Sequence, residues 1–83
     1  MLKEILFFTE EEAKKLEKLL NNEEIEIKDN LDFFKLVSEK AHQLDNIKVD
    51  NVNEEENKKI YIINYYRDLY QDYISSLKRN NTN

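Results

Sequence analysis

Glycine, proline and cysteine are all missing from this chain of 83 residues. Without glycine, the tight hairpin turns of all-β proteins are disfavoured, and the glycine-rich loops that bind nucleotide phosphates are excluded. Without cysteine, disulfides and thiolate metal sites are excluded, and the single histidine, His42, is too little for a histidine-built metal site. Asparagine residues stand at the positions where helices are expected to end. These absences predict a helical protein with no metal and no cofactor.

The chain is so short that its hydrophobic core must be thin. A domain of this size buries only about 60% of the surface that its unfolded chain exposes. Small domains usually compensate for a thin core with disulfides, a bound metal or a protein partner. Because this composition disfavours the first two, a protein partner is the expected means of stabilisation. We therefore expect a single small helical domain over residues 1–79 with a polar tail over residues 80–83. We also expect this domain to assemble, either with itself or with another protein.

The net charge of −5 is unevenly distributed along the chain. Residues 1–53 carry 13 acidic and 8 basic residues, whereas residues 54–83 carry 5 of each. No basic stripe is present, which disfavours direct binding of nucleic acid. No stretch approaches the roughly 18 apolar residues of a membrane span, and no signal-peptide pattern opens the chain. The sequence therefore predicts a cytoplasmic protein that contacts neither nucleic acid nor membrane.

The first part of the chain predicts a short helix followed by a longer one. Residues 1–8 read as a short helix or a hydrophobic lead-in. Thr9 stands three residues before Glu12, which is the spacing of a capping box. The glutamates that follow Thr9 are interpreted as helix-start electrostatics, with a cation or basic-partner site as the alternative. Apolar residues then recur at helical spacing at Ala13, Leu16, Leu19 and Leu20.

Two interpretations stay open for the middle of the chain. Five apolar residues follow each other seven apart, which favours one long helix from about Glu10 to Leu44. The asparagines within residues 21–30, and the alternation of Ile25 and Ile27 with glutamate, favour two helices broken in that stretch. Residues 31–44 are amphipathic in both cases. The five residues seven apart are Ala13, Leu20, Ile27, Phe34 and Ala41.

The last segment carries the strongest helix pattern. Asn53 can cap this helix, with Glu56 three residues later. The helix is predicted over Glu54 to Lys78, after a linker at residues 45–53. The expected fold class is all-α, a small helical hairpin or bundle with a short N-terminal helix, a long or broken middle helix and a long C-terminal helix. Two salt bridges between residues four apart are expected on this last helix, Glu54–Lys58 and Glu55–Lys59.

Five tyrosines fall within thirteen residues of the predicted C-terminal helix. Tyrosine offers a large contact area with a polar tip and is enriched at protein interfaces. Tyr61 and Tyr65 lie off the apolar stripe of the helix, so they are the better interface candidates, while core packing accounts for part of the rest. The predicted partner interface consists of Tyr61, Tyr65 and the linker residues Ile47, Val49 and Val52.

The catalytic possibilities are few. Ser38 and His42 are four residues apart on one predicted helix and could touch. No third group and no oxyanion donor accompanies them, and the carboxylates are spread over solvated faces. The sequence therefore predicts a chain that is not an enzyme on its own.

Two stretches together resemble a known family. They are FFTEEEAKKLEKLL at residues 7–20 and LDFFKLVSEKAHQLDNIKVDNV at residues 31–52. Their Thr-Glu-Glu-Glu opening, the Leu-Asp-Phe-Phe run and the loop LDNIKVDNV are similar to the C subunit of glutamyl-tRNA(Gln)/aspartyl-tRNA(Asn) amidotransferase. Tyr66-Arg67-Asp68 faintly resembles an element of that family's C-terminal arm, although the arm is extended there and residues 54–78 predict a helix here.

This resemblance implies a non-catalytic assembly subunit that bridges the amidase subunit and the tRNA-binding subunit. ATP, magnesium and the nucleophilic serine would then belong to those partners. Two other classes stay open from the residues themselves. One is a small acidic helical inhibitor, of the kind carried by phages or mobile elements, which binds a basic host protein. The other is a self-associating helical dimer.

Overall fold

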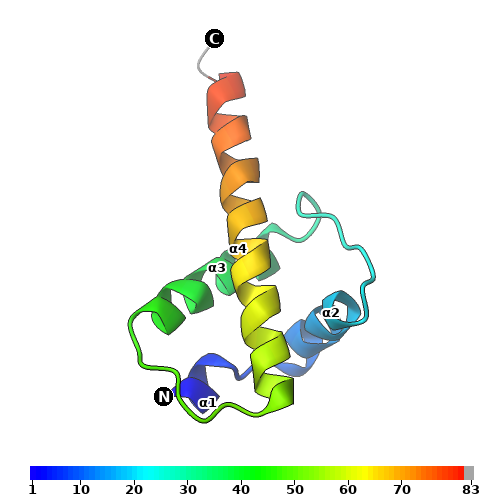
Figure 1. The fold of residues 1–83 in the computed structure, drawn as a ribbon. Coiled ribbons are helices and arrows are strands. Elements are labelled where there is room, and N and C mark those ends of the chain that lie inside the picture. The colour runs from blue at the N-terminus through cyan, green and yellow to red at the C-terminus, as the bar shows by residue number, and fades with distance from the viewer. Residues whose placement is uncertain (82–83) are drawn as a thin grey trace.

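A computed structural model describes residues 1–81 of the chain, and these residues form an all-α fold, as predicted. Figure 1 shows the shorter helices gathered around one end of a long one. No strand occurs within residues 1–81, so the alternation of isoleucine and glutamate near residue 25 does not form one. The elements are α1 (Leu2–Ile5), α2 (Glu10–Leu20), α3 (Leu31–Asp45) and α4 (Glu54–Asn81).

The capping box at the start of α2 is confirmed. The Glu12 N–H donates to Thr9 Oγ1 over 3.3 Å, and the Thr9 N–H donates to Glu12 Oε1 over 3.0 Å. Each side chain thus satisfies a backbone donor that the first turn of a helix leaves without a partner. The start of this helix is thus stabilised by side chains only three residues apart in the sequence.

An asparagine in the left-handed conformation ends α2. Asn22 has a φ of 63°, a region that glycine usually occupies and that asparagine tolerates. The Asn22 N–H donates to the carbonyl of Leu19, and the Glu23 N–H donates to the carbonyl of Lys18. These two hydrogen bonds form a Schellman motif, which closes the helix and turns the chain. Asparagine therefore performs the task of the missing glycine.

The break within residues 21–30 decides between the two interpretations of the middle of the chain. Two helices, α2 and α3, are present, and the single long helix from Glu10 to Leu44 is wrong. The seven-residue repeat does not mark one buried face, because Ala13 is exposed. Leu31, the first residue of α3, is also 39% exposed. The isoleucines at 25 and 27 instead pack in part against the core from an irregular segment.

The core lies where α3 meets α4. Figure 1 shows α3 crossing behind α4 at an angle, below the projecting half of the long helix. Phe34, Val37 and Ala41 of α3 are fully buried, and so is Ile63 of α4. An ion pair of 2.7 Å between Asp45 and Arg67 closes one edge of this contact. The complete buried set is Ile5, Leu6, Leu16, Leu19, Phe33, Phe34, Val37, Ala41, Leu44 and Ile63.

Lys40 attaches the N-terminal segment to this core. Its ammonium donates to the carbonyls of Ile5 and Phe7, over 2.7 and 2.8 Å, and lies 4.7 Å from the centroid of the Phe8 ring. The residue is only 8% exposed. Burial lowers the pKa of Lys40, and the nearby carboxylate of Glu12 opposes that shift. The sequence does not single out Lys40, because its partners are backbone atoms more than thirty residues away.

The predicted cap of the C-terminal helix is also confirmed. The Glu56 N–H donates to Asn53 Oδ1 over 2.8 Å, and the Asn53 N–H donates to Glu56 Oε1 over 3.1 Å. The helix has 28 residues and is about 42 Å long at 1.5 Å per residue. It continues through residues 80 and 81 of the expected polar tail, whose last two residues lie outside the described part. The C-terminal half of α4 projects beyond the other helices (Figure 1) and gives the molecule its longest dimension, 48 Å.

Candidate functional site

The outward face of α4 carries a stacked pair of tyrosines. Tyr61 and Tyr65 are 68% and 49% exposed, and their rings lie 6.3 Å apart with 14° between their planes. Their spacing of four residues places them one above the other on the helix surface. The structure therefore puts both predicted interface tyrosines at the surface, side by side.

This pair is backed by a row of aromatic rings that leads into the core. The rings of Tyr65 and Tyr66 meet edge to face, with their centroids 5.0 Å apart. The centroid of the Tyr66 ring lies 5.5 Å from that of the buried Phe34, and the Phe34 centroid lies 5.2 Å from that of Phe33. Burial raises the pKa of Tyr66, and the charges of Tyr65 and Glu24 raise it further. Exposed rings held in this way lose little conformational freedom on binding, so the pair is preorganised for contact.

Two hollows of about 350 and 270 Å³ lie beside the tyrosine pair, between α4 and the end of α2. Both are lined by Asn22, Tyr61 and Ile62. The larger hollow also reaches Leu20, whereas the smaller one reaches Tyr65. Because Asn22 ends α2 there, the turn that breaks the middle of the chain also shapes this surface.

The linker residues predicted to share the interface differ in their exposure. Ile47 packs in part against the core, Val52 is half-buried and only Val49 is exposed. Of these three linker residues, Val49 therefore offers the most surface to a partner.

The serine and histidine of α3 do not form a pair. Ser38 is buried and His42 is exposed, and no hydrogen bond joins their side chains. The contact considered from the sequence is therefore not made. Within residues 1–81, no group of three or more histidine, aspartate or glutamate side chains is placed to hold a metal ion.

Acidic residues follow the tyrosines along the same outward face. Asp68 and Asp72 come seven and eleven residues after Tyr61, a spacing that keeps them on one side of the helix. Both are exposed; Asp68 lies 3.6 Å from the Arg67 guanidinium, whereas the described residues 1–81 give Asp72 no ion pair. The face is thus aromatic at one end and acidic at the other.

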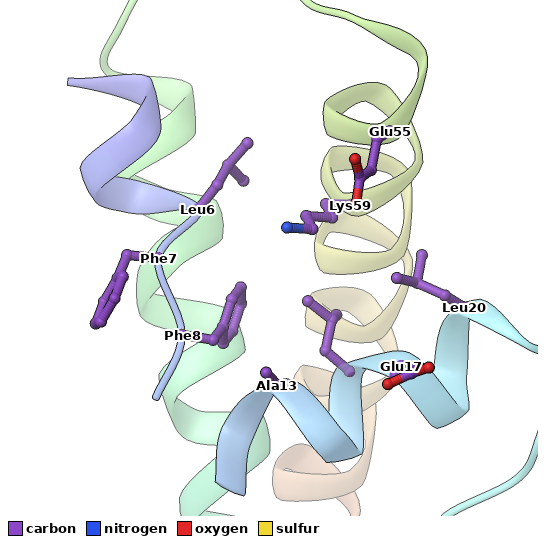
Figure 2. Close-up of a pocket in the computed structure, with 9 residues that line it drawn as sticks. Leu6, Phe7, Phe8, Ala13, Glu17, Leu20, Glu55 and Lys59 are labelled. Atoms are coloured by element: carbon purple, nitrogen blue, oxygen red, sulfur yellow. The ribbon is translucent and has the colours of Figure 1, made fainter. Parts of the chain in front are cut away.

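A cavity of about 530 Å³ lies on another side of α4 and was not predicted from the sequence. Figure 2 shows it between the segment that joins α1 to α2, the helix α2 and the first turns of α4. Residues 6–20 meet there with the first turns of α4, more than thirty residues later in the chain, so no local pattern could reveal it. Its apolar walls consist of Leu6, Phe7, Phe8, Ala13, Leu16 and Leu20.

Charged residues of α4 line one wall of this cavity. The Lys59 amine points into the cavity, toward the wall that carries Leu6 and Phe8 (Figure 2). The expected salt bridge between Glu55 and Lys59 is absent from the described residues, whereas Glu54 and Lys58 do pair, at 3.9 Å. One of the two predicted helix pairs is therefore wrong, because the lysine turns toward the apolar hollow instead of toward its neighbour.

No protein-family model, no curated protein and no solved structure matches this chain. The resemblance to the amidotransferase C subunit therefore stays a prediction from the sequence. Among residues 1–81, no helix has both the length and the apolar character needed to cross a membrane.

Proposed function

We propose that this protein is a non-catalytic binding subunit that recognises another protein through the outward face of α4. The observation that carries the proposal is the stacked, exposed pair Tyr61–Tyr65, held on a rigid helix and anchored through Tyr66 to the core. Tyrosines of this kind dominate the energetics of many interfaces, because they bury a large area at a small entropic cost. The two hollows beside the pair give a partner's apolar side chains places to insert.

The particular form that the resemblance supports is an assembly subunit of a tRNA-dependent amidotransferase. In that form the chain bridges the amidase and tRNA-binding subunits and supplies no catalytic group of its own. Its support is the sequence likeness of residues 7–20 and 31–52. On this proposal the complex works in translation, in the cytoplasm.

A second candidate is an acidic inhibitor or regulator of a basic protein. The outward face of α4 favours it, since Tyr61 and Tyr65 are followed there by Asp68 and Asp72. Tyrosine rings stack against arginine guanidinium groups, and aspartates pair with them. The net charge of −5 would also accelerate encounter with a basic partner.

A pull-down from the native cell, read by mass spectrometry at moderate salt, tests the proposal. The bait is the tagged full chain, compared with Tyr61→Ala/Tyr65→Ala and with Tyr61→Phe/Tyr65→Phe. Recovery of both amidotransferase subunits in equal amount supports the assembly subunit, and recovery of one basic protein supports the inhibitor. In either case the alanine variant should lose the prey and the phenylalanine variant should keep most of it. Equal recovery of the prey by all three baits would show that the tyrosine face is not the binding surface.

A further inference from the structure

The cavity beside the first turns of α4 has the size of a site for a small molecule. Its volume is about 530 Å³, and pockets that bind drug-sized ligands measure about 300–1,000 Å³. Such pockets are mostly apolar and carry a few polar groups that fix the orientation of the ligand. Figure 2 shows the same division here, with apolar side chains on the segment that joins α1 to α2 and charged side chains on α4.

The apolar walls of the cavity are held in place by the fold. Leu6 and Leu16 are buried members of the hydrophobic core, and Phe8 and Leu20 pack against that core. Side chains that are already fixed do not have to be ordered when a ligand enters, so little conformational entropy is lost on binding. The cavity is therefore preformed, and an apolar group that enters it exchanges contact with water for contact with these walls.

Lys59 brings a positive charge to this apolar hollow. Its amine points toward the wall that carries Leu6 and Phe8 (Figure 2), and the residue is half-buried. Among the described residues 1–81 it has no ion pair, hydrogen bond or ring contact. An ammonium that loses part of its hydration beside apolar side chains, and gains no partner there, is unfavourable. An anionic group in the cavity would supply that partner through a charge-assisted hydrogen bond.

Two glutamates also line the cavity, and they limit the charge that a ligand can carry. Glu17 and Glu55 are both exposed, so water screens their carboxylates more strongly than it screens the half-buried Lys59. Neither forms an ion pair with Lys59 in the part of the chain that the structure describes. A second anionic group on the ligand would approach these carboxylates and be repelled. One negative charge at one end of an apolar molecule therefore fits better than several.

We propose that the cavity binds a small apolar monocarboxylate, of the class of medium-chain fatty acids, with its carboxylate on Lys59 and its chain against Leu6 and Phe8. The Lys59 amine donates to a carboxylate oxygen, and the chain displaces water from the apolar walls. The inference does not depend on the proposed function, because Tyr61 comes two residues after Lys59 and so lies on the opposite side of α4.

Calorimetric titration of the full chain with octanoate, kept below the concentration at which it forms micelles, is the first test. Octanol, which is neutral, and octylamine, which is cationic, have the same chain length and control for the head group. We expect octanoate to bind about tenfold more tightly than octanol, and octylamine to bind most weakly. Absence of octanoate binding, equal binding of all three, or a preference for octylamine would each overturn the inference.

Three variants test where the ligand lies. Lys59→Met keeps an apolar stem but removes the charge, so it should reduce octanoate affinity about tenfold and leave octanol affinity unchanged. Lys58→Met is the matched control, because Lys58 is exposed and pairs with Glu54, and it should bind octanoate like the wild type. Ala13→Leu fills part of the cavity and should weaken both ligands. Equal effects of the two lysine substitutions, or an Ala13→Leu variant that binds normally, would contradict this site, and circular dichroism confirms that each variant is folded.

Discussion

The ammonium of Lys40 lies 2.7 Å from the carbonyl oxygen of Ile5 and thereby ties α3 to the end of α1. A helix leaves its last carbonyls without partners, and a helix of four residues is too short to persist alone in water. A buried lysine that satisfies the carbonyl of Ile5, and that of Phe7 just beyond the helix, therefore holds the N-terminal segment in place. This segment forms one wall of the cavity, so Lys40 also shapes the cavity.

Replacing Lys40 by methionine should destabilise the fold. The carbonyls of Ile5 and Phe7 lose their donor, and an unsatisfied buried acceptor costs about 1–3 kcal/mol. Urea unfolding followed by circular dichroism measures the loss. Lys35→Met is the control, because Lys35 is exposed on the same helix and its replacement should stay within about 0.5 kcal/mol. Equal effects of the two substitutions would show that the buried hydrogen bonds contribute nothing.

Tyr66 should make the protein less stable in alkali. Its pKa is raised, mainly by burial, so the folded chain keeps the phenol proton at a pH where the unfolded chain has lost it. By linkage, the free energy of unfolding then falls as the pH rises above about 10. Tyr66→Phe removes this group, so its urea midpoint should decline less than that of the wild type between about pH 9 and pH 11.

Lys40 acts in the opposite sense over the same range. Its pKa is lowered, so the folded chain releases a proton before the unfolded chain does, and stability rises as the pH approaches 10.5. The wild type and the Tyr66→Phe variant both carry Lys40. The difference between their urea midpoints as a function of pH therefore reports the contribution of Tyr66 alone. Superimposable profiles would mean that Tyr66 titrates alike in the folded and unfolded states.

Asn22 should tolerate glycine but not alanine. Its φ of 63° is left-handed, and a residue with a Cβ but no compensating side chain loses about 1–2 kcal/mol there. Asn22→Ala should therefore lower the urea midpoint, while Asn22→Gly should keep it near the wild-type value. Asn21→Ala, at a φ of −92°, is the matched control and should have little effect. A destabilised glycine variant together with an unaffected alanine variant would contradict this account of the turn.

The two halves of α4 should respond differently to truncation of an isoleucine. Ile63 is fully buried under α3, and its replacement by alanine should cost about 2–5 kcal/mol. Ile74, on the projecting half, lies outside the core, so Ile74→Ala should cost less than about 1 kcal/mol in the monomer. Thermal unfolding at a dilution that dissociates any dimer makes the comparison. Similar losses at both positions would mean that the projecting half packs on the globule.

The sequence by itself determined the all-α fold class and the residues at which α2 and α4 begin. The reciprocal caps Thr9–Glu12 and Asn53–Glu56 were predictable because their hydrogen bonds join residues only three apart. The exposure of Tyr61 and Tyr65 followed from their place off the apolar stripe. The break after α2 stayed undecided, since a seven-residue apolar repeat competed with the asparagines, and the Schellman turn at Asn22 settles it.

Only the tertiary structure decided which long-range contacts form. In the sequence, Lys40 resembles any charged residue of an amphipathic helix, and only the fold brings the carbonyls of Ile5 and Phe7 within 2.8 Å of its ammonium. The cavity, and the turn of Lys59 away from Glu55, arise where three separate segments meet. Packing between distant segments depends on the shapes of all the contacting side chains and on how deeply they are buried. The spacing of residues along the sequence does not reveal either property.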